Sequence, residues 1–74
     1  MFIAEPKGEF HGLFIELKKE GVRLKKLNGD WATSHVEEQA RVLDELRERG
    51  YKAEFAVGFD EAIELIDSYL GGVK

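Results

Sequence analysis

An apolar run near the N-terminus, FHGLFIELKK, constrains the fold of this chain most, because it predicts a half-buried β-strand over residues 12–18. Residues two apart in a strand point to the same face of a sheet. We therefore expect three side chains to face the core: Leu13, Ile15 and Leu17. Glu16 and Lys18 should then project together from the other face, beside Phe14.

A carboxylate and an ammonium held side by side at the end of a strand can serve phosphodiester chemistry. The carboxylate of Glu16 can bind a divalent metal, and Lys18 can act on the phosphate and the attacking water. This pair therefore indicates a nuclease. The alternative is an ordinary ion pair on an exposed sheet face, which contributes little to stability.

The composition predicts one small domain. At 74 residues the chain is too short for two, and a domain of this size buries only roughly 60% of its unfolded surface. The chain has no cysteine, which excludes disulfides and thiolate metal sites and fits a reducing cytoplasm. The sequence shows neither an apolar run of about 20 residues, as a membrane span requires, nor a secretory signal.

The net charge of −4 argues against a protein that coats nucleic acid by bulk charge. The distribution of charge is more informative, because five basic residues fall within nine positions and most acidic residues come later. These basic residues are Lys18, Lys19, Arg23, Lys25 and Lys26. Such a segment can contact phosphates at one place on an acidic protein. The alternative is a loop that is simply solvated.

The remaining pattern predicts a hairpin followed by a strand–helix–strand–helix unit. Residues 2–4 and 12–18 read as antiparallel strands around turn formers at 6–8. Residues 20–33 are irregular and polar, and Asn28-Gly29 indicates a tight turn in a small β-excursion flanked by Leu24 and Trp31.

A helix is expected from Ser34, because Ser34 and Glu37 match a capping box, and Gly50 should end it. The third strand is expected over Tyr51–Val57. Asp60 should cap a second helix, which Gly71-Gly72 ends. Five residues are expected on the buried side of that helix: Ala62, Ile63, Ile66, Tyr69 and Leu70. The order β-β-α-β-α predicts an α/β (α+β) fold whose mixed sheet contains a right-handed parallel crossover.

The sequence resembles a known family of domains. The segments FHGLFIELKKEG and WATSHVEEQARVLDELRERGYKAEFAVGFDEAIELIDSYL resemble the VRR-NUC domain of phage and bacterial proteins, a branch of the PD-(D/E)xK nucleases. The resemblance covers nearly the whole chain. E-x-K alone is common by chance. E-x-K at a strand end, a glutamine in the next helix, a G-Y-x-A strand and a Y-L terminus are together more specific. The resemblance implies a small restriction-endonuclease-like core.

The resemblance implies roles for four residues. Glu16 would ligate the metal through its carboxylate and Leu17 through its backbone carbonyl. Lys18 would position or activate the attacking water, and Gln39 would lie near the same site. Hard oxygen ligands imply Mg²⁺ or Mn²⁺. Lys19, Arg23, Lys25 and Lys26 are the expected nucleic-acid-binding residues.

The chain departs from the family at its start. The family places a Pro-Asp pair immediately before the strand that begins here at Met1, and that aspartate is a principal metal ligand. We therefore expect residues 1–74 to form one domain that is incomplete at its N-terminus and cleaves DNA weakly. The resemblance implies DNA, including branched DNA, as the substrate, and a homodimer is the expected assembly. The alternatives are a non-catalytic nucleic-acid-binding module and a protein-interaction or assembly module.

Five other residues are weaker candidates for a site. His11 and His35 lack ligand spacing and are expected to be structural or exposed. Glu5 and Glu9, near the hairpin turn, are the residues that could replace the family's aspartate. Trp31 is expected to pack over the excursion rather than on a nucleic-acid base.

Overall fold

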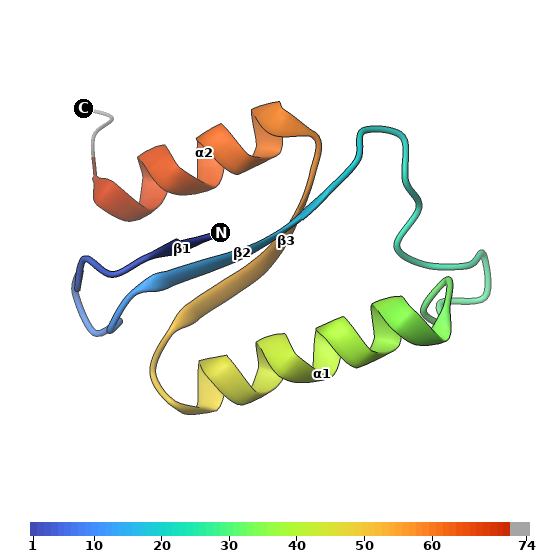
Figure 1. Ribbon diagram of the computed structural model, residues 1–74, viewed down its shortest axis with the longest axis horizontal. Helices are drawn as coiled ribbons and strands as arrows, with labels where there is room; N and C mark the ends of the chain where they lie inside the picture. The colour runs from blue at the N-terminus through green and yellow to red at the C-terminus, as the bar shows by residue number, and fades with distance from the viewer. Residues whose placement is uncertain (72–74) are drawn as a thin grey trace.

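The computed structural model describes residues 1–71, which form a three-stranded sheet between two helices (Figure 1). The elements in chain order are β1 (Phe2–Ile3), β2 (Leu13–Lys18), α1 (Ser34–Glu48), β3 (Lys52–Val57) and α2 (Phe59–Leu70). The predicted order β-β-α-β-α and the mixed sheet are confirmed. Neither described helix has the length and apolar character needed to cross a membrane.

The sheet order is β1-β2-β3, with β2 in the centre. β1 pairs antiparallel with β2, with Phe2 opposite Phe14, and β3 pairs parallel with β2 from Leu13–Lys52 to Lys18–Val57. α1 links the two parallel strands and covers one face of the sheet, while α2 covers the other (Figure 1). The predicted parallel pairing of β2 and β3 through a connecting helix is therefore confirmed.

α1 begins at Ser34, as expected, but the expected cap residue is wrong. Thr33, rather than Ser34, is the N-cap, because its backbone is extended and its Oγ1 accepts a hydrogen bond of 3.0 Å from the Val36 N–H. Both residue types can cap a helix, and the backbone conformation decides between them. Gly50 follows the helix with a φ of 92°. The N–H of Tyr51 donates to the Leu46 carbonyl, which is the bond that closes a Schellman motif.

The expected cap of α2 is also wrong. Gly58 is the N-cap and Asp60 lies within the first turn. Glu61 reaches back instead, and its carboxylate accepts a hydrogen bond of 2.7 Å from the Val57 N–H. Gly71 ends the helix in the left-handed conformation with a φ of 69°, as expected, whereas Gly72 lies outside the described residues.

The core is divided between the two faces of the sheet. On the α2 face, Leu13 and Ile15 pack with residues of β3 and α2: Ala56, Ala62 and Tyr69. On the α1 face, Val36, Ala40 and Leu43 are buried against the sheet.

Three residues expected in the core are exposed. Leu17 lies on the predicted face of β2 but is 45% exposed, and the register of β1, which pairs with Leu13 and Phe14, does not reach it. Ile63 and Leu70 of α2 are also exposed. A helix of this length presents only part of its apolar surface to one side of a three-stranded sheet.

The outer edge of β3 is covered by a side chain of α1. Arg47 Nε donates a hydrogen bond of 2.8 Å to the Ala53 carbonyl, and its guanidinium lies 2.6 Å from Asp44 and 3.7 Å from Glu54. An edge strand with an occupied carbonyl and a charged rim is a poor template for a further strand.

Candidate functional site

Glu16 and Gln39 meet across the interface between β2 and α1. Glu16 lies on the α1 face of β2, and Gln39 Nε2 donates a hydrogen bond of 2.9 Å to its Oε2. Gln39 reaches this position because it borders the buried stripe of α1, three residues after Val36. Both residues were expected in one site, and in the structure they are joined by this hydrogen bond.

The amide oxygen of Gln39 is buried and accepts no hydrogen bond from any described residue. A carboxylate can only accept, so the amide nitrogen must face Glu16 and the oxygen must point elsewhere. Leaving a buried acceptor unpaired costs about 1–3 kcal/mol. Gln39 therefore presents an oxygen that a hydrogen-bond donor or a cation would satisfy.

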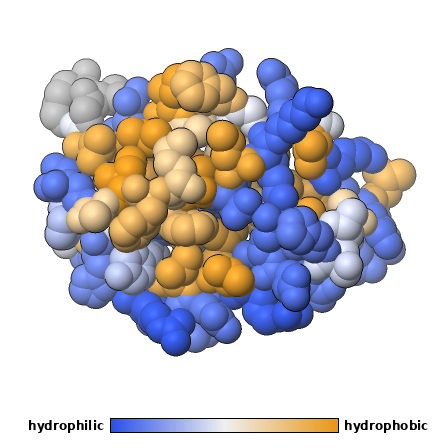
Figure 2. All heavy atoms as spheres, viewed as in Figure 1, coloured by the Kyte–Doolittle hydropathy of each residue, from blue (hydrophilic) through white to orange (hydrophobic). Residues whose placement is uncertain are grey.

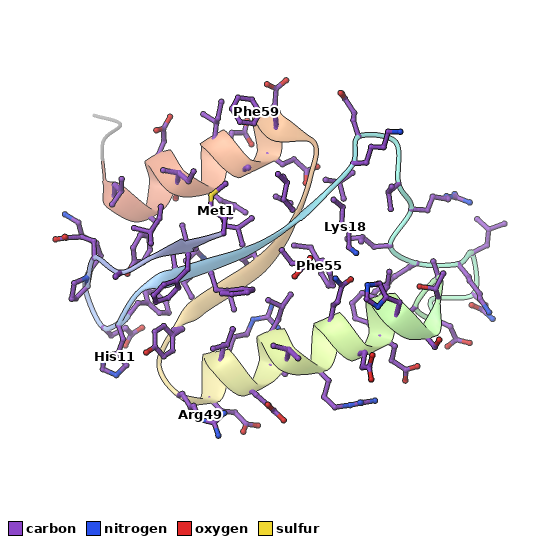
Figure 3. The ribbon with its side chains drawn as sticks, viewed as in Figure 1. Met1, His11, Lys18, Arg49, Phe55 and Phe59 are labelled. Atoms are coloured by element: carbon purple, nitrogen blue, oxygen red, sulfur yellow. The ribbon has the colours of Figure 1, made fainter. Side chains whose placement is uncertain are left out.

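Lys18 projects from the same face of β2 as Glu16, at the end of the strand. Figure 3 shows Lys18 and Phe55 both pointing from the sheet toward α1. Phe55 stands opposite Glu16 on β3, and Lys18 is opposite Val57. The side chain of Lys18 is half-buried, so its ammonium lies at the margin of the space between sheet and helix.

The backbone of Leu17 faces the open side of β2. The Gly12 carbonyl accepts a hydrogen bond from Lys52 of β3, and the Lys18 carbonyl accepts one from Gly58, directly after β3. The backbone groups of even-numbered residues of β2 therefore point toward β3. Those of odd-numbered residues point toward β1, where Met1 and Ile15 exchange two hydrogen bonds. Within residues 1–71, the register of β1 places nothing opposite Leu17. Its carbonyl is therefore available as a ligand at the sheet edge.

The described residues supply only part of a magnesium site. Mg²⁺ prefers octahedral oxygen coordination and releases its waters reluctantly unless anionic oxygens replace them. Glu16 offers one carboxylate and Leu17 one carbonyl. In residues 1–71, no three His, Cys, Asp or Glu side chains gather as metal ligands would. Glu5 and Glu9 lie in the hairpin turn, near the N-terminal end of β2. Glu16 and Lys18 lie toward the C-terminal end of that strand.

The basic excursion after β2 folds into a short hairpin of its own. Lys25 and Trp31 form an antiparallel bridge, and the Lys26 N–H donates a hydrogen bond of 2.7 Å to the Asp30 carbonyl. The Lys26 carbonyl accepts from the Gly29 N–H at 3.0 Å, so Leu27 and Asn28 occupy the centre of the turn. Gly29 follows with a φ of 94°. This is a three-residue hairpin loop with a glycine bulge, and it confirms the predicted turn and β-excursion.

Trp31 anchors this excursion to the sheet. Its ring lies 5.8 Å from the ring of Phe55, and the Lys25 ammonium lies 4.7 Å above the tryptophan ring. Trp31 therefore packs over the excursion, as expected. Lys19, Arg23, Lys25 and Lys26 are all exposed.

The remaining candidate residues lie away from Glu16. His11 lies at the opposite end of the sheet. Its backbone N–H donates a hydrogen bond to the Gly50 carbonyl, and its ring lies 5.7 Å from the ring of Tyr51. His35 is exposed on α1. Phe55, which stands opposite Glu16, was not expected at this site. It is identified by the parallel register of β2 and β3.

Comparison with known proteins adds no assignment to this geometry: no family model matches the chain, and no curated protein or solved structure matches it significantly.

Proposed function

We propose that this chain is a metal-dependent DNA endonuclease domain that hydrolyses phosphodiester bonds with the site around Glu16. The observation that carries the proposal is the hydrogen bond of 2.9 Å between Gln39 and Glu16. A glutamine from α1 holds the carboxylate, and Lys18 projects from the same strand face two residues away. This arrangement supports the roles that the resemblance to the VRR-NUC domain implies.

Each side chain has a separate task in this proposal. Glu16 and the Leu17 carbonyl would hold Mg²⁺ or Mn²⁺, and the hydrogen bond from Gln39 fixes the orientation of the Glu16 carboxylate. Lys18 orients the attacking water and stabilises charge on the phosphate. The bound metal would lower the pKa of a water molecule and neutralise charge that develops on the phosphate.

The register of the sheet identifies where a second carboxylate would complete the site. Phe2 is opposite Phe14 and Met1 is opposite Ile15, so a residue joined directly ahead of Met1 would lie opposite Glu16. Directly opposite residues in antiparallel strands share a face, with Cβ atoms about 4.5–5.5 Å apart. This is the position in which the family places its aspartate.

We expect the 74 residues alone to cleave duplex or branched DNA little or not at all with Mg²⁺, and at most in trace amounts with Mn²⁺. A version extended by Pro-Asp ahead of Met1 should cleave with Mg²⁺ about a hundredfold faster or more, because the metal and its water are then correctly placed. The measurement is cleavage of labelled duplex and branched DNA. A Pro-Asn extension is the matched control, and Lys18→Ala in the Pro-Asp version should abolish cleavage.

Two results would change the proposal. Robust Mg²⁺-dependent cleavage by the unextended chain, lost in Glu16→Ala, would mean that another residue supplies the ligand, with Glu5 or Glu9 the first to test. An inactive Pro-Asp version would contradict the nuclease. A non-catalytic nucleic-acid-binding module would then take its place, and four exposed basic residues favour that second candidate: Lys19, Arg23, Lys25 and Lys26.

We also propose that the chain forms a homodimer through the β1 edge of the sheet. Met1 and Phe2 are 50% and 52% exposed. Figure 2 shows apolar surface gathered over β1 and the adjoining part of α2. In light scattering, the chain should have the mass of a dimer, and Phe2→Glu should shift it toward the monomer. Val42→Glu, an equally exposed position on α1, should not. A monomer at high concentration would contradict this assembly.

A further inference from the structure

A cavity of about 570 Å³ lies between the turn that joins β1 to β2 and the C-terminal end of α2. It is lined by residues 7–10 of the turn, by Lys52 at the start of β3 and by residues 68–69 of α2. Figure 1 shows the turn and this end of α2 at the same end of the molecule. Sites for small molecules have volumes of roughly 300–1,000 Å³. This turn cavity is therefore large enough for a ligand.

Lys52 brings a positive charge to the core face of the sheet. It stands opposite Leu13, which is 0% exposed and packs against α2, so Lys52 lies on the α2 face as well. Its side chain is only 30% exposed, and its ammonium lies 3.8 Å from the carboxylate of Glu54. That distance is too long for a hydrogen bond. No described residue accepts a hydrogen bond from this ammonium, so its donors are available to a ligand.

The turn supplies further donors. The Lys7 N–H donates to the Phe10 carbonyl at 3.1 Å, and the Phe10 N–H donates to the Lys7 carbonyl at 2.9 Å, so Gly8 and Glu9 occupy its centre. Within residues 1–71, the N–H groups of Gly8 and Glu9 and the ammonium of Lys7 donate to no acceptor. Successive N–H groups in a turn can form an anion-binding concavity. These donors and Lys52 favour an anionic ligand.

Two aromatic rings form the apolar part of the turn cavity. The ring centroids of Phe10 and Tyr69 lie 6.3 Å apart, and the Lys52 ammonium lies 5.8 Å from the centroid of Phe10. Tyr69 is 7% exposed, and its hydroxyl donates a hydrogen bond of 2.7 Å to the Glu5 carbonyl. Both rings are held in place without a ligand, which lowers the entropic cost of binding one.

We propose that the turn cavity binds a small phosphate ester that carries a flat ring, such as a nucleoside monophosphate. The ring contacts Phe10 and Tyr69, and the phosphate binds the ammonium groups of Lys7 and Lys52. A phosphate group suits these donors better than a carboxylate, because it carries more charge and three acceptor oxygens. The exposed carboxylate of Glu9 also lines the cavity and opposes the anion.

The proposal does not rest on the proposed nuclease. The turn cavity lies on the α2 face, at the N-terminal ends of β2 and β3, whereas Glu16 lies on the α1 face toward the other end of β2. A ligand in the turn cavity therefore leaves the Glu16 site accessible.

The test is titration of the isotope-labelled, full-length chain with adenosine monophosphate, followed by the NMR shifts of its backbone amides. The largest shifts should occur at residues 7–10, Lys52 and Ser68, and the amides of Glu16 and Trp31 should not move. Adenosine and inorganic phosphate each lack one half of the ligand and should bind about tenfold more weakly or less. The 5′-carboxylate of adenosine should also bind more weakly than the phosphate.

Four variants assign the binding to these side chains. Lys52→Met keeps the length of the side chain and removes its charge, so the affinity for adenosine monophosphate should fall about tenfold, as for one lost hydrogen bond to a charged group. Lys7→Gln, in the exposed turn, should also weaken binding without touching the core. Glu9→Gln should strengthen binding, because it removes a repelling charge. Lys25→Gln is the matched control, since the Lys25 ammonium also lies over a ring, 4.7 Å from the centroid of Trp31, and binding should not change.

Four results would overturn the proposal. They are the absence of any shift, shifts centred on Trp31 or Glu16, equal affinity for adenosine or its carboxylate, and an affinity that survives both Lys52→Met and Lys7→Gln. Weakening in Lys25→Gln alone would move the binding to the basic excursion and also overturn it. None of these results bears on cleavage of DNA at Glu16, so the two proposals fail separately.

Discussion

Leu13→Ala is expected to lower the free energy of unfolding by about 2–5 kcal/mol, the usual cost of removing a fully buried leucine side chain. Leu13 is 0% exposed and packs in the cluster between β2, β3 and α2. Globular proteins are stable by only about 0.05–0.15 kcal/mol per residue, so this one substitution should remove much of the stability of so small a domain. Urea unfolding followed by circular dichroism and by Trp31 fluorescence measures the change.

Leu27→Ala is the matched control, since it makes the same chemical change at a side chain that is 91% exposed. It should alter the free energy of unfolding by less than about 0.5 kcal/mol, as is usual for a surface substitution. Equal effects of the two substitutions would contradict the placement of the core on the α2 face of β2.

Glu16→Gln is expected to lower the rate of DNA cleavage about a hundredfold or more in the version that carries Pro-Asp ahead of Met1, because the metal and its water lose their position. The fold should be unaffected. The new amide oxygen can still accept the hydrogen bond that Gln39 donates at 2.9 Å, so the free energy of unfolding should change by less than about 0.5 kcal/mol. Single-turnover cleavage and urea unfolding of the same samples separate the two effects.

Glu54→Gln is the control for Glu16→Gln. Glu54 lies on β3 opposite Ile15, and its carboxylate pairs with Arg47 at 3.7 Å and Lys52 at 3.8 Å. Partly exposed ion pairs of this kind contribute little to stability. Cleavage should therefore continue in Glu54→Gln. If both substitutions reduced cleavage equally, a general electrostatic effect would replace the metal-ligand role of Glu16.

The parts of the fold that follow from periodicity could be predicted from the sequence. The alternation in β2 and the stripe of Val36, Ala40 and Leu43 in α1 determine which faces meet, and from these the parallel crossover follows. Periodicity does not determine how far neighbouring elements extend. Leu17 therefore has the predicted orientation but is exposed, because it lies outside the register of β1 with Leu13 and Phe14.

Helix caps were less predictable because adjacent residues had similar chemistry. Thr33 and Ser34 can both accept a hydrogen bond from the first turn, and only the extended backbone at Thr33 distinguishes them. At α2, Gly58 takes the N-cap position with a φ of 89°, although Asp60 is the better capping residue by type.

The proximity of Glu16 and Gln39 was predictable from the sequence, whereas the surroundings of these two residues were not. The resemblance to the VRR-NUC domain named Glu16, Lys18 and Gln39, and the hydrogen bond between the first and last of these agrees with their expected proximity. The packing of Trp31 on Phe55 joins residues that are far apart in the sequence and share no local pattern. Only the register of the sheet places this contact beside Glu16.

The side chain that lies across the outer edge of β3 also limits the size of any assembly built through the sheet. Arg47 occupies the Ala53 carbonyl at that edge, whereas the edge beside β1 and Leu17 remains open. A subunit with two open edges can add copies at both and grow into a filament. A subunit with one open edge can join only one partner through it, so association of this chain by strand pairing should stop at two copies and give a closed, finite particle.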